Sequence, residues 1–483
     1  MEILVPVRGR GDVTAGIYAR LRDAIEVGRL RPGERLPSSR DMARDLAVAR
    51  GTVAAAYDAL IAEGYAVARV GAGTFVVSGT TAHNLAGDAV AVGPSAIATP
   101  QAAVVPDFDF RLGIPDPRLF PISAWRRAMG HAIDEAVVVA PGYGDPAGDA
   151  GLRAAIARHA GVSRGVRGGA DDVVITQGAQ GAIDLVTRVL VRAGDAVAVE
   201  EPGYPPARAR FAAAGARVVG VGVDDEGLRV DLLPDDARLV YVTPSHQLPT
   251  GVAQSPGRRA ALLAWAEAHD AVILEDDYDS EFRYAPRPLE PLQRLDRSWR
   301  VVYVGSFSKT LLPMLRLGFL IAPPRLVADL REARRLAGWH GDAPTQIAMR
   351  RFIDDGGFAR HLRRARRVYR VRRERVVAGV ERDLRPWLRL NASAAGLHVC
   401  AMAVAGVSAD DVRRAAARAR AMGVAVETLD AYAGPGGPGG PRGPGVVLGF
   451  GMIDESRIDE GLARLAHAFG DVSGVGPAGA LPG

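Results

Sequence analysis

Apolar residues near the start of the chain recur at the spacing of an α-helix. Ile17, Leu21 and Ile25 mark the first such segment. Ser39 is a candidate N-cap for the second segment. The second and third helical patterns cover residues 40–46 and 50–63. The opening of the chain therefore predicts three short helices.

Two short apolar runs follow the third predicted helix. They cover residues 65–69 and 74–77, with a glycine-containing turn between them, and predict a hairpin of two strands. Three helices and a hairpin predict a winged helix-turn-helix domain over residues 1–78. Residues 79–106 are rich in Ala, Gly, Thr, Val and Pro, carry few charges and have no periodicity, which predicts a flexible linker.

From residue 107 to about residue 470, apolar runs alternate with helical patterns. Runs typical of buried strands begin near residues 172, 196, 239, 271 and 301. This alternation predicts an α/β domain with a mostly parallel sheet. We expect this domain to have a large part over about 150–343 and a smaller C-terminal α+β part over about 344–470. The smaller part should contain a long arginine-rich helix near 358–382 and a low-complexity loop at 434–445. Residues 471–483 are predicted to be a disordered tail.

The composition indicates a globular protein of more than one domain. The chain has 483 residues, of which 48% are hydrophobic and 24% charged, and its formal net charge of +5 is compatible with a nucleic-acid partner. The single cysteine, Cys400, lies in an apolar run and is predicted to be a buried strand residue. No stretch offers about 20 uninterrupted apolar residues. We therefore expect no membrane segment. A single thiol forms no internal disulfide, which suits the reducing cytoplasm, so we expect a cytoplasmic protein. We predict no metal site.

Lys309 is the only lysine in the chain, although lysine and arginine together number 60. Arginine serves equally well for surface charge, but its pKa stays above about 12, so it does not act as an amine nucleophile. A single lysine on the turn after an apolar strand predicts Schiff base formation with an aldehyde cofactor. A solvated surface charge is the alternative. Ser306 and Lys309 also fit a serine acylation motif, but the Lys-Thr-Gly partner of that motif is absent.

Polar residues follow the predicted strands, as they do where a ligand lies across the carboxyl ends of a parallel sheet. A glycine-rich turn at 177–181 leads into a helix and predicts a phosphate cradle made of backbone N–H groups. An aldehyde cofactor also needs an aromatic plate and an acid beside its ring nitrogen. Tyr204 and Asp276, each of which follows a predicted strand, are candidates for these roles.

The first domain resembles the GntR family of bacterial regulators. The matching motifs are LRPGERLPSSR at 30–40 and GAGTFV at 71–76. A helix-turn-helix of this kind places its third helix in the major groove of DNA. In this chain Arg50 would read guanine, and the residues expected to hold phosphates or support the wing are Thr52, Arg40, Arg44 and Gly73. A helical protein-docking module is the alternative.

The chain from about Asp109 to Ala468 resembles the aspartate aminotransferase fold of enzymes that use pyridoxal 5'-phosphate (PLP). The resemblance rests on the motifs SFSK at 306–309, EDDY at 275–278, EPGY at 201–204 and GYGDPAG at 142–148. It implies that Lys309 forms the Schiff base, that Asp276 faces the pyridine nitrogen and that Tyr278 faces the phenolic oxygen. Tyr204 would stack on the ring.

The same resemblance implies further cofactor contacts. The residues expected at the phosphate are Gly178, Ala179, Ser306, Ser308 and Arg316. Tyr143 would reach the phosphate of a partner subunit. His246 or Gln247 would supply a group to the cofactor oxygen, and a one-residue insertion before Pro249 leaves that choice open. The predicted fold class is thus α/β, with a winged helix-turn-helix joined to a PLP-dependent transferase fold.

The two domains together resemble the MocR regulators, a subfamily of GntR-type transcription factors. This resemblance implies a homodimer that binds a double-stranded DNA operator and responds to PLP or an amino compound. Transaminases of this fold hold the substrate α-carboxylate with an arginine in a late strand, where this chain has Val447. Arg442 or Arg208 would have to compensate. A working aminotransferase with an attached DNA-binding domain is the alternative function, and the sequence does not distinguish an activator from a repressor.

Overall fold

The computed structural model describes residues 13–69, 71–77, 106–139, 142–284, 290–393, 395–434 and 443–472. The chain forms two compact units, Met1–Ala103 and Val104–Gly483. The predicted linker, the low-complexity loop and the C-terminal tail lie, except at their edges, outside the described residues. Within the described residues, no helix combines the length and the apolar composition needed to cross a membrane.

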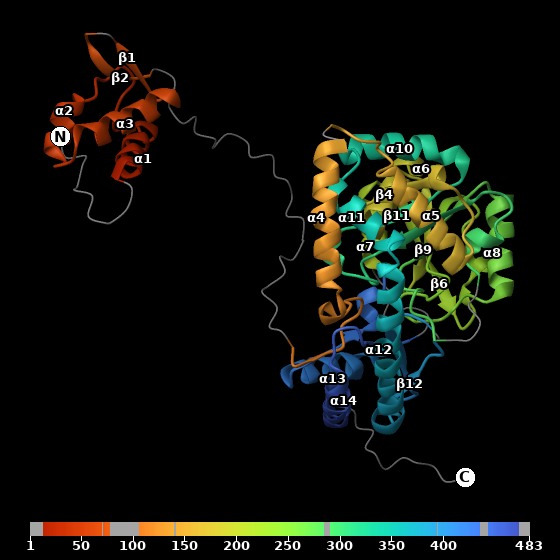
Figure 1. The fold of residues 1–483 in the computed structure, drawn as a ribbon. Helices are drawn as coiled ribbons and strands as arrows, with labels where there is room; N and C mark the ends of the chain where they lie inside the picture. The colour runs from red at the N-terminus through yellow and green to blue at the C-terminus, as the bar shows by residue number, and fades with distance from the viewer. Residues whose placement is uncertain are drawn as a thin grey trace, which may run out of the picture. The chain divides into compact units, whose positions relative to one another are not determined.

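The first unit contains the three helices and the hairpin that the sequence predicts (Figure 1). Its elements are α1 (Val13–Glu26), α2 (Ser39–Asp45), α3 (Arg50–Ala62), β1 (Ala66–Arg69) and β2 (Gly73–Val76). The N-cap of α2 is Ser38 and not Ser39. Ser38 has an extended backbone, and its Oγ accepts a hydrogen bond of 3.1 Å from the backbone N–H of Asp41.

A single small core holds the first unit together. The buried side chains of the three helices meet there, with Ile17 and Leu21 from α1 and Val53 and Leu60 from α3. Tyr57 of α3 donates a hydrogen bond of 2.9 Å to the backbone oxygen of Pro37, just before α2. The second and third helices are therefore fixed relative to one another.

Eight described strands of the second unit form its large sheet, in the order β4-β11-β10-β9-β8-β5-β6-β7. The pairs β9 with β10, β8 with β9, β5 with β8, and β5 with β6 are parallel, whereas β11 is antiparallel to both neighbours. The strands are β4 (Val173–Thr176), β5 (Ala196–Glu201), β6 (Arg217–Asp224), β7 (Gly227–Leu228), β8 (Ala237–Val242), β9 (Val272–Asp277), β10 (Val301–Ser306) and β11 (Gly318–Ile321). The five strands predicted from the sequence are all present, and the predicted α/β class is confirmed.

Alternate residues of the central strands enter different cores. Tyr303 of β10 packs with residues of α4, α5, α11 and α12, whereas Val302 and Val304 pack with residues of α6, α7 and α10. The helices are α4 (Ile122–Val139), α5 (Ala150–Arg164), α6 (Gly178–Leu190), α7 (Pro205–Ala213), α8 (Pro256–Ala268), α9 (Leu292–Leu295), α10 (Pro324–Gly338), α11 (Ala343–Asp354) and α12 (Gly357–Gly379). Figure 1 shows α4 and α11 side by side. Burial on both faces explains why these strands read as continuous apolar runs.

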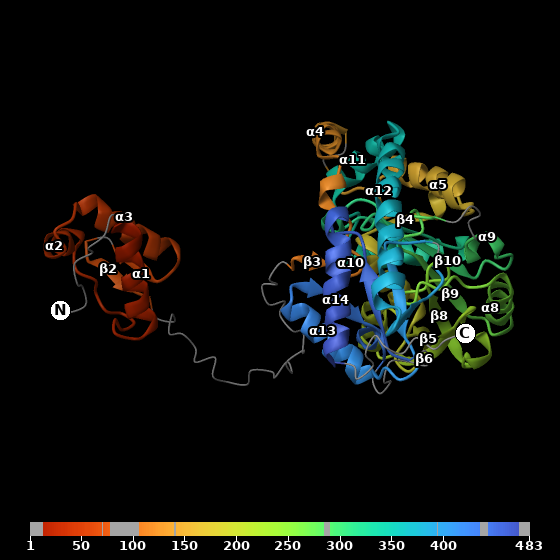
Figure 2. The ribbon, with the colours of Figure 1, turned by 90° about the horizontal axis from the view of Figure 1, so that it is seen from below.

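A second, antiparallel sheet has the order β12-β13-β16-β15. Its strands and the nearby elements are β12 (Leu388–Leu390), β13 (His398–Ala403), β15 (Glu427–Thr428), β16 (Gly445–Gly449), α13 (Ala409–Ala421) and α14 (Ile458–Val472). In Figure 2, α12 and α14 lie side by side. Cys400 is fully buried in β13, as the sequence predicts.

One pairing in the smaller part has no signal in the sequence. The short strand β3 (Phe108–Asp109) precedes the whole large sheet in the chain, yet it pairs in parallel with β14 (Val424–Ala425). The beginning of the second unit therefore packs with its C-terminal part. Gly113, a few residues later, is brought next to the turn after β10.

Candidate functional site

The carboxyl ends of the parallel strands surround a cavity of about 170 Å³. Eight of the residues predicted for the cofactor line it. They are Lys309, Asp276, Tyr278, Tyr204, Ala179, Ser306, Ser308 and Arg316. The sheet topology thus brings together residues that are far apart in the sequence, at the edge where a parallel sheet is expected to bind its ligand.

Lys309 follows β10, and its Nζ donates a hydrogen bond of 2.6 Å to the backbone oxygen of Gly113. Gly113 has a φ of +83°, and a Cβ at this position would lie 2.7 Å from Nζ, so a side chain there would displace the amine. Burial lowers the pKa of the Lys309 ammonium, while Asp279, Asp276 and Glu427 act in the opposite direction. The net lowering favours the neutral amine, which is the nucleophilic form.

Asp276 lies near the carboxyl end of β9 and lines the same cavity. The hydroxyl of Tyr241 donates a hydrogen bond of 2.7 Å to its Oδ2, and its Oδ1 is buried without a hydrogen-bond partner among the described residues. Burial raises the pKa of Asp276 to about 7. A buried polar atom of a native protein normally has a partner, and a protonated ring nitrogen would be a suitable one.

Arg316 and the beginning of α6 form a cationic part of the lining. Arg316 donates a hydrogen bond of 2.8 Å to the backbone oxygen of Gln177, and its guanidinium lies 3.4 Å from the position that a Cβ of Gly178 would take. The N-cap residue Gln177 makes no side-chain capping bond, so it does not occupy the first N–H groups of α6. Free N–H groups at a helix N-terminus together with a guanidinium suit a phosphate group. The residues present therefore fit PLP.

Four of the predicted cofactor residues are not part of the cavity lining. Gly178, the first residue of α6, lies next to the guanidinium of Arg316, and the other three lie elsewhere. Tyr143 is 86% exposed and its ring packs on Trp339, with the ring centroids 5.0 Å apart. The amide nitrogen of Gln247 donates to the backbone oxygens of Pro202 and Leu248, at 2.8 and 2.7 Å. His246 is buried in a separate polar cluster.

His246 lies among polar groups from both sheets of the second unit. Its Nδ1 is 3.1 Å from both carboxylate oxygens of Asp279 and 3.2 Å from the hydroxyl of Tyr278, and its Nε2 is 3.1 Å from Oγ of Ser393. His398, at the start of β13, is buried beside it, and donor atoms of His246, Asp279 and His398 lie within 4.8 Å of one another. His246 thus contacts Tyr278, which lines the cavity, and it links the two sheets.

The sequence did not indicate Tyr241 or Thr243, which also line the cavity. Tyr241 is buried in β8 next to aliphatic residues. A phenol in such a strand was the sequence signal that could have identified it as a site residue. Thr243 and Gln247 both donate hydrogen bonds to the buried carboxylate of Glu200, at the end of β5. Burial raises the pKa of Glu200 to about 7. This network joins the ends of β5 and β8 on one side of the cavity.

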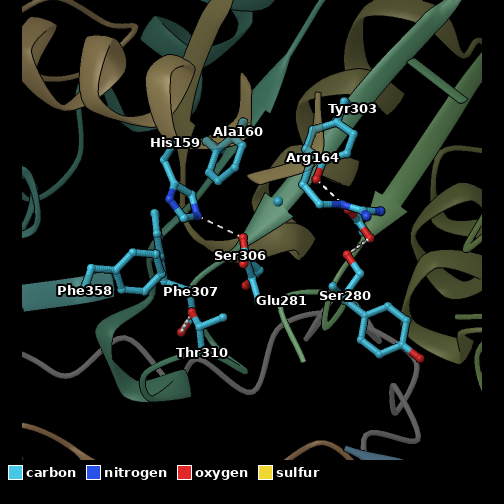
Figure 3. A pocket seen from close by; sticks show the side chains of 14 residues that line it. His159, Ala160, Arg164, Ser280, Glu281, Tyr303, Ser306, Phe307, Thr310 and Phe358 are labelled. Atoms are coloured by element: carbon cyan, nitrogen blue, oxygen red, sulfur yellow. Dashed lines mark hydrogen bonds and ion pairs between the residues drawn. The ribbon is translucent and has the colours of Figure 1, made fainter. Parts of the chain in front are cut away.

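A second cavity, of about 30 Å³, shares Tyr278 and Ser306 with the first. Figure 3 shows the side chains that line this second cavity, including Arg164 and Tyr303. Arg164 of α5 and Asp277 of β9 form a buried ion pair of 2.6 Å there, and Tyr303 donates a hydrogen bond of 2.6 Å to the same carboxylate. Burial acts to raise the pKa of Asp277, but Arg164 and the hydrogen-bond donors hold it below its usual value. The pair fixes the strand end that carries the neighbouring Asp276.

The candidate DNA-contacting residues lie on the first unit. Arg40, Arg44 and Arg50 are exposed on α2 and α3, and Arg50 donates a hydrogen bond of 3.3 Å to Oγ of Ser39. Thr52 is half-buried in the first turn of α3. Arg44 is paired with Asp41.

Gly73, the remaining residue predicted for the DNA-binding face, begins β2. It has a φ of +112°, and a Cβ there would lie 2.8 Å from Nε of Arg35. A glycine therefore allows the wing to pack against that guanidinium.

Comparison with known proteins assigns a family to each unit. Residues 13–76 match the bacterial regulatory proteins of the gntR family, and residues 110–416 match aminotransferase class I and II. The second match includes every residue that lines the 170 Å³ cavity.

Full-length relatives and solved structures agree with this assignment. The chain is 37% identical to the probable rhizopine catabolism regulatory protein MocR of Rhizobium meliloti, over 96% of this chain and 95% of that protein. It is 34% identical to the pyridoxine biosynthesis transcriptional regulator PdxR of Corynebacterium glutamicum, over 93% and 94% of the two chains. A kynurenine aminotransferase of Pyrococcus horikoshii, solved with PMP, matches with a TM-score of 0.69 and 27% identity, over 76% of this chain and 92% of its own.

Proposed function

The chain belongs to the MocR subfamily of GntR-type transcriptional regulators, and from this premise we propose that Lys309 holds PLP as part of a ligand-responsive DNA-binding switch. The protein is a transcriptional regulator with a helix-turn-helix unit and an aminotransferase-like unit. In the proposal the second unit senses PLP, or an amino compound that binds beside it. The relative named for pyridoxine biosynthesis supports PLP itself as an effector.

The proposal is carried by Oδ1 of Asp276, which has no hydrogen-bond partner among the described residues and belongs to the cavity that Lys309 also lines. In the proposal Asp276 holds the proton on the ring nitrogen, Tyr204 packs on the ring and Tyr278 faces the phenolic oxygen. Arg316 and the N-terminus of α6 hold the phosphate. When bound, PLP supplies an electrophilic aldehyde carbon and a ring that accepts electrons.

The regulatory part of the proposal needs two arrangements of the protein with unequal affinity for the ligand. A ligand changes DNA affinity only if it binds these arrangements unequally, and the coupling is then reciprocal. We propose that the DNA-binding protein is a homodimer that acts in the cytoplasm, with Arg50 in the major groove. The exposed Tyr143 would reach the cofactor phosphate of the partner subunit.

The experiment that tests this function measures DNA affinity with and without PLP. Full-length protein is titrated, by fluorescence anisotropy, into labelled DNA from the region upstream of its own gene. We expect PLP to change the apparent affinity of the wild type by about fivefold or more, and to leave that of Lys309→Ala unchanged. An equal response of the two proteins would contradict the proposal.

A slow transamination half-reaction is a second candidate activity, because Lys309, Asp276 and Tyr278 are all retained around the cavity. Val447 stands where the fold would place a carboxylate-binding arginine, so we propose that ordinary α-amino acids do not turn over efficiently. Steady multiple turnover of an α-amino acid with no effect on DNA binding would instead favour an enzyme.

A further inference from the structure

The long helix α12 concentrates positive charge on its outer face (Figure 2). Five exposed arginines recur there at intervals of three or four residues, which places them in one row along the helix. We call this row the arginine stripe. It consists of Arg360, Arg363, Arg364, Arg367 and Arg370. At a rise of 1.5 Å per residue the stripe is about 15 Å long.

The arginine stripe differs from the arginines of neighbouring helices because it has no anionic partner. On α13, Arg414 pairs with Asp411, and on α10, Arg335 pairs with Glu332. Among the described residues, no guanidinium of the stripe makes an ion pair or a side-chain hydrogen bond, and Glu374 is the single acidic residue of α12. Like charges at these spacings repel one another and destabilise a helix, so a polyanion that covered the stripe would stabilise α12.

The inner face of α12 fixes the helix within the second unit. Leu362 is buried in the core, and Nε2 of His361 lies 2.6 Å from the backbone oxygen of Thr310. Arg372 forms a buried ion pair of 2.6 Å with Asp116. The arginine stripe is thus carried by a well-packed helix, and a ligand that binds it has to order only the side chains of the stripe.

Double-stranded DNA matches the length and the charge of the arginine stripe. A duplex carries one negative charge per about 1.7 Å of its axis, so a segment of 15 Å holds about nine phosphate charges. Guanidinium groups bind phosphates through charge-assisted hydrogen bonds. The first unit binds DNA, and the predicted linker at 79–106 spans up to about 90 Å when extended. DNA next to the operator is therefore a polyanion at high local concentration.

We propose that the arginine stripe binds phosphate groups of the double-stranded DNA that flanks the sequence bound by the helix-turn-helix. The contact is to the DNA backbone, so it adds affinity without reading sequence. This inference goes beyond the proposed function, in which the second unit binds only the small ligand. It does not depend on PLP.

The variant Arg363→Gln/Arg364→Gln/Arg367→Gln tests the proposal in the full-length protein. Fluorescence anisotropy measures its affinity, at several salt concentrations, for a duplex of about 100 base pairs from the region upstream of its own gene. Each phosphate contact contributes about 0.9 to the slope of log affinity against log salt concentration. We expect the slope to fall by about 2, and the affinity at about 0.1 M salt to fall about tenfold or more.

Two matched variants separate a contact from a change in net charge. Arg192→Gln/Arg238→Gln/Arg325→Gln removes three exposed arginines outside the stripe, and it should change the slope and the affinity much less. Replacing the same three stripe arginines by lysine keeps the charge and should retain most of the affinity. An equal loss in the control variant would overturn the inference.

Sequence preference gives a further readout. The glutamine variant of the stripe should weaken binding to the upstream duplex and to a duplex of scrambled sequence by the same factor, because phosphate contacts do not read bases. Its melting temperature and its binding of PLP should match those of the wild type, since the stripe is exposed and lies outside the cavity lining.

The remaining outcomes separate this inference from the proposed function. An unchanged affinity and salt slope in the glutamine variant would overturn the inference, and the proposed function would stand if PLP still altered DNA affinity. If the wild type loses its response to PLP but the stripe variant still binds DNA more weakly, the proposed function is overturned and the inference stands.

Discussion

Tyr241 donates a hydrogen bond of 2.7 Å to Oδ2 of Asp276, while Oδ1 of the same carboxylate is buried with no hydrogen-bond partner among the described residues. This half-satisfied acid lies in one cavity with the amine of Lys309. Without a cofactor, Asp276 is either ionised, which costs free energy because the charge is buried, or protonated as a result of its raised pKa. A cation next to Oδ1 would remove that cost.

Asp276→Asn should change how the stability of the cofactor-free protein depends on pH. The pKa of Asp276 rises from its ordinary value of 3.8 to about 7 because the group is buried. The folded protein therefore binds this proton more tightly than the unfolded chain, and the stabilisation is lost as pH rises through about 7. Asp276→Asn has no titratable group at this position, so its stability does not fall in this way. We expect its stability relative to the wild type to rise from about pH 4 to about pH 7, and to be higher near pH 8 than near pH 5 by about 3 kcal/mol.

Thermal melting of both proteins between pH 5 and pH 8 measures this difference. PLP should stabilise the wild type at pH 8 and have less effect on Asp276→Asn, because ligand binding to the folded state raises its stability. A melting difference that does not vary with pH would contradict the assignment of a raised pKa to Asp276.

Arg164→Ala should destabilise the second unit strongly, because it leaves the carboxylate of Asp277 buried without its ion-pair partner. The side chains of Arg164 and Asp277 are 3% and 2% exposed. Removing one member of a buried pair costs about 3–5 kcal/mol. Melting temperature, with PLP binding as a second readout, measures the effect.

Arg158→Ala is the matched control on the same helix. Arg158 pairs with Asp354 at 2.7 Å, but its side chain is 63% exposed, and such pairs contribute about 1 kcal/mol or less. Similar decreases in melting temperature for Arg164→Ala and Arg158→Ala would show that the buried ion pair stabilises the protein no more than the exposed pair does.

Arg50→Ala should weaken binding to the operator by about 1–3 kcal/mol and relax sequence preference at one base pair. Arg50 begins α3, and its side chain is exposed next to Ser39. Arg22→Ala, on α1, also removes one positive charge and should lower the affinity for the operator less than Arg50→Ala does. Anisotropy titrations at fixed salt compare the two. Equal losses would indicate that Arg50 contributes only charge.

The sequence predicted those cavity residues that have a distinctive side chain and stand at the end of a recognisable buried strand. Lys309 and Asp276 were found because a lone amine and an acid each follow a recognisable buried strand. The apolar runs predicted the strands of the large sheet, since burial on both faces requires them to be apolar.

Long-range placement could not be predicted in the same way. Nothing in Phe108 or Asp109 indicates pairing with a strand more than 300 residues later. Gln247 has the amide expected of a cofactor contact, but the local turn directs it to backbone oxygens. Tyr241 was missed because its burial in β8 conceals the hydroxyl that reaches Asp276.

Borohydride reduction of the PLP-treated protein, followed by peptide mass spectrometry, tests the central claim most directly. Lys309 is the only lysine, so the ε-amine that can be modified is unique in the chain. We expect one phosphopyridoxyl group on the peptide that contains Lys309 and none on that peptide in Lys309→Ala. An unmodified Lys309, or modification confined to the N-terminal amine, would contradict the account.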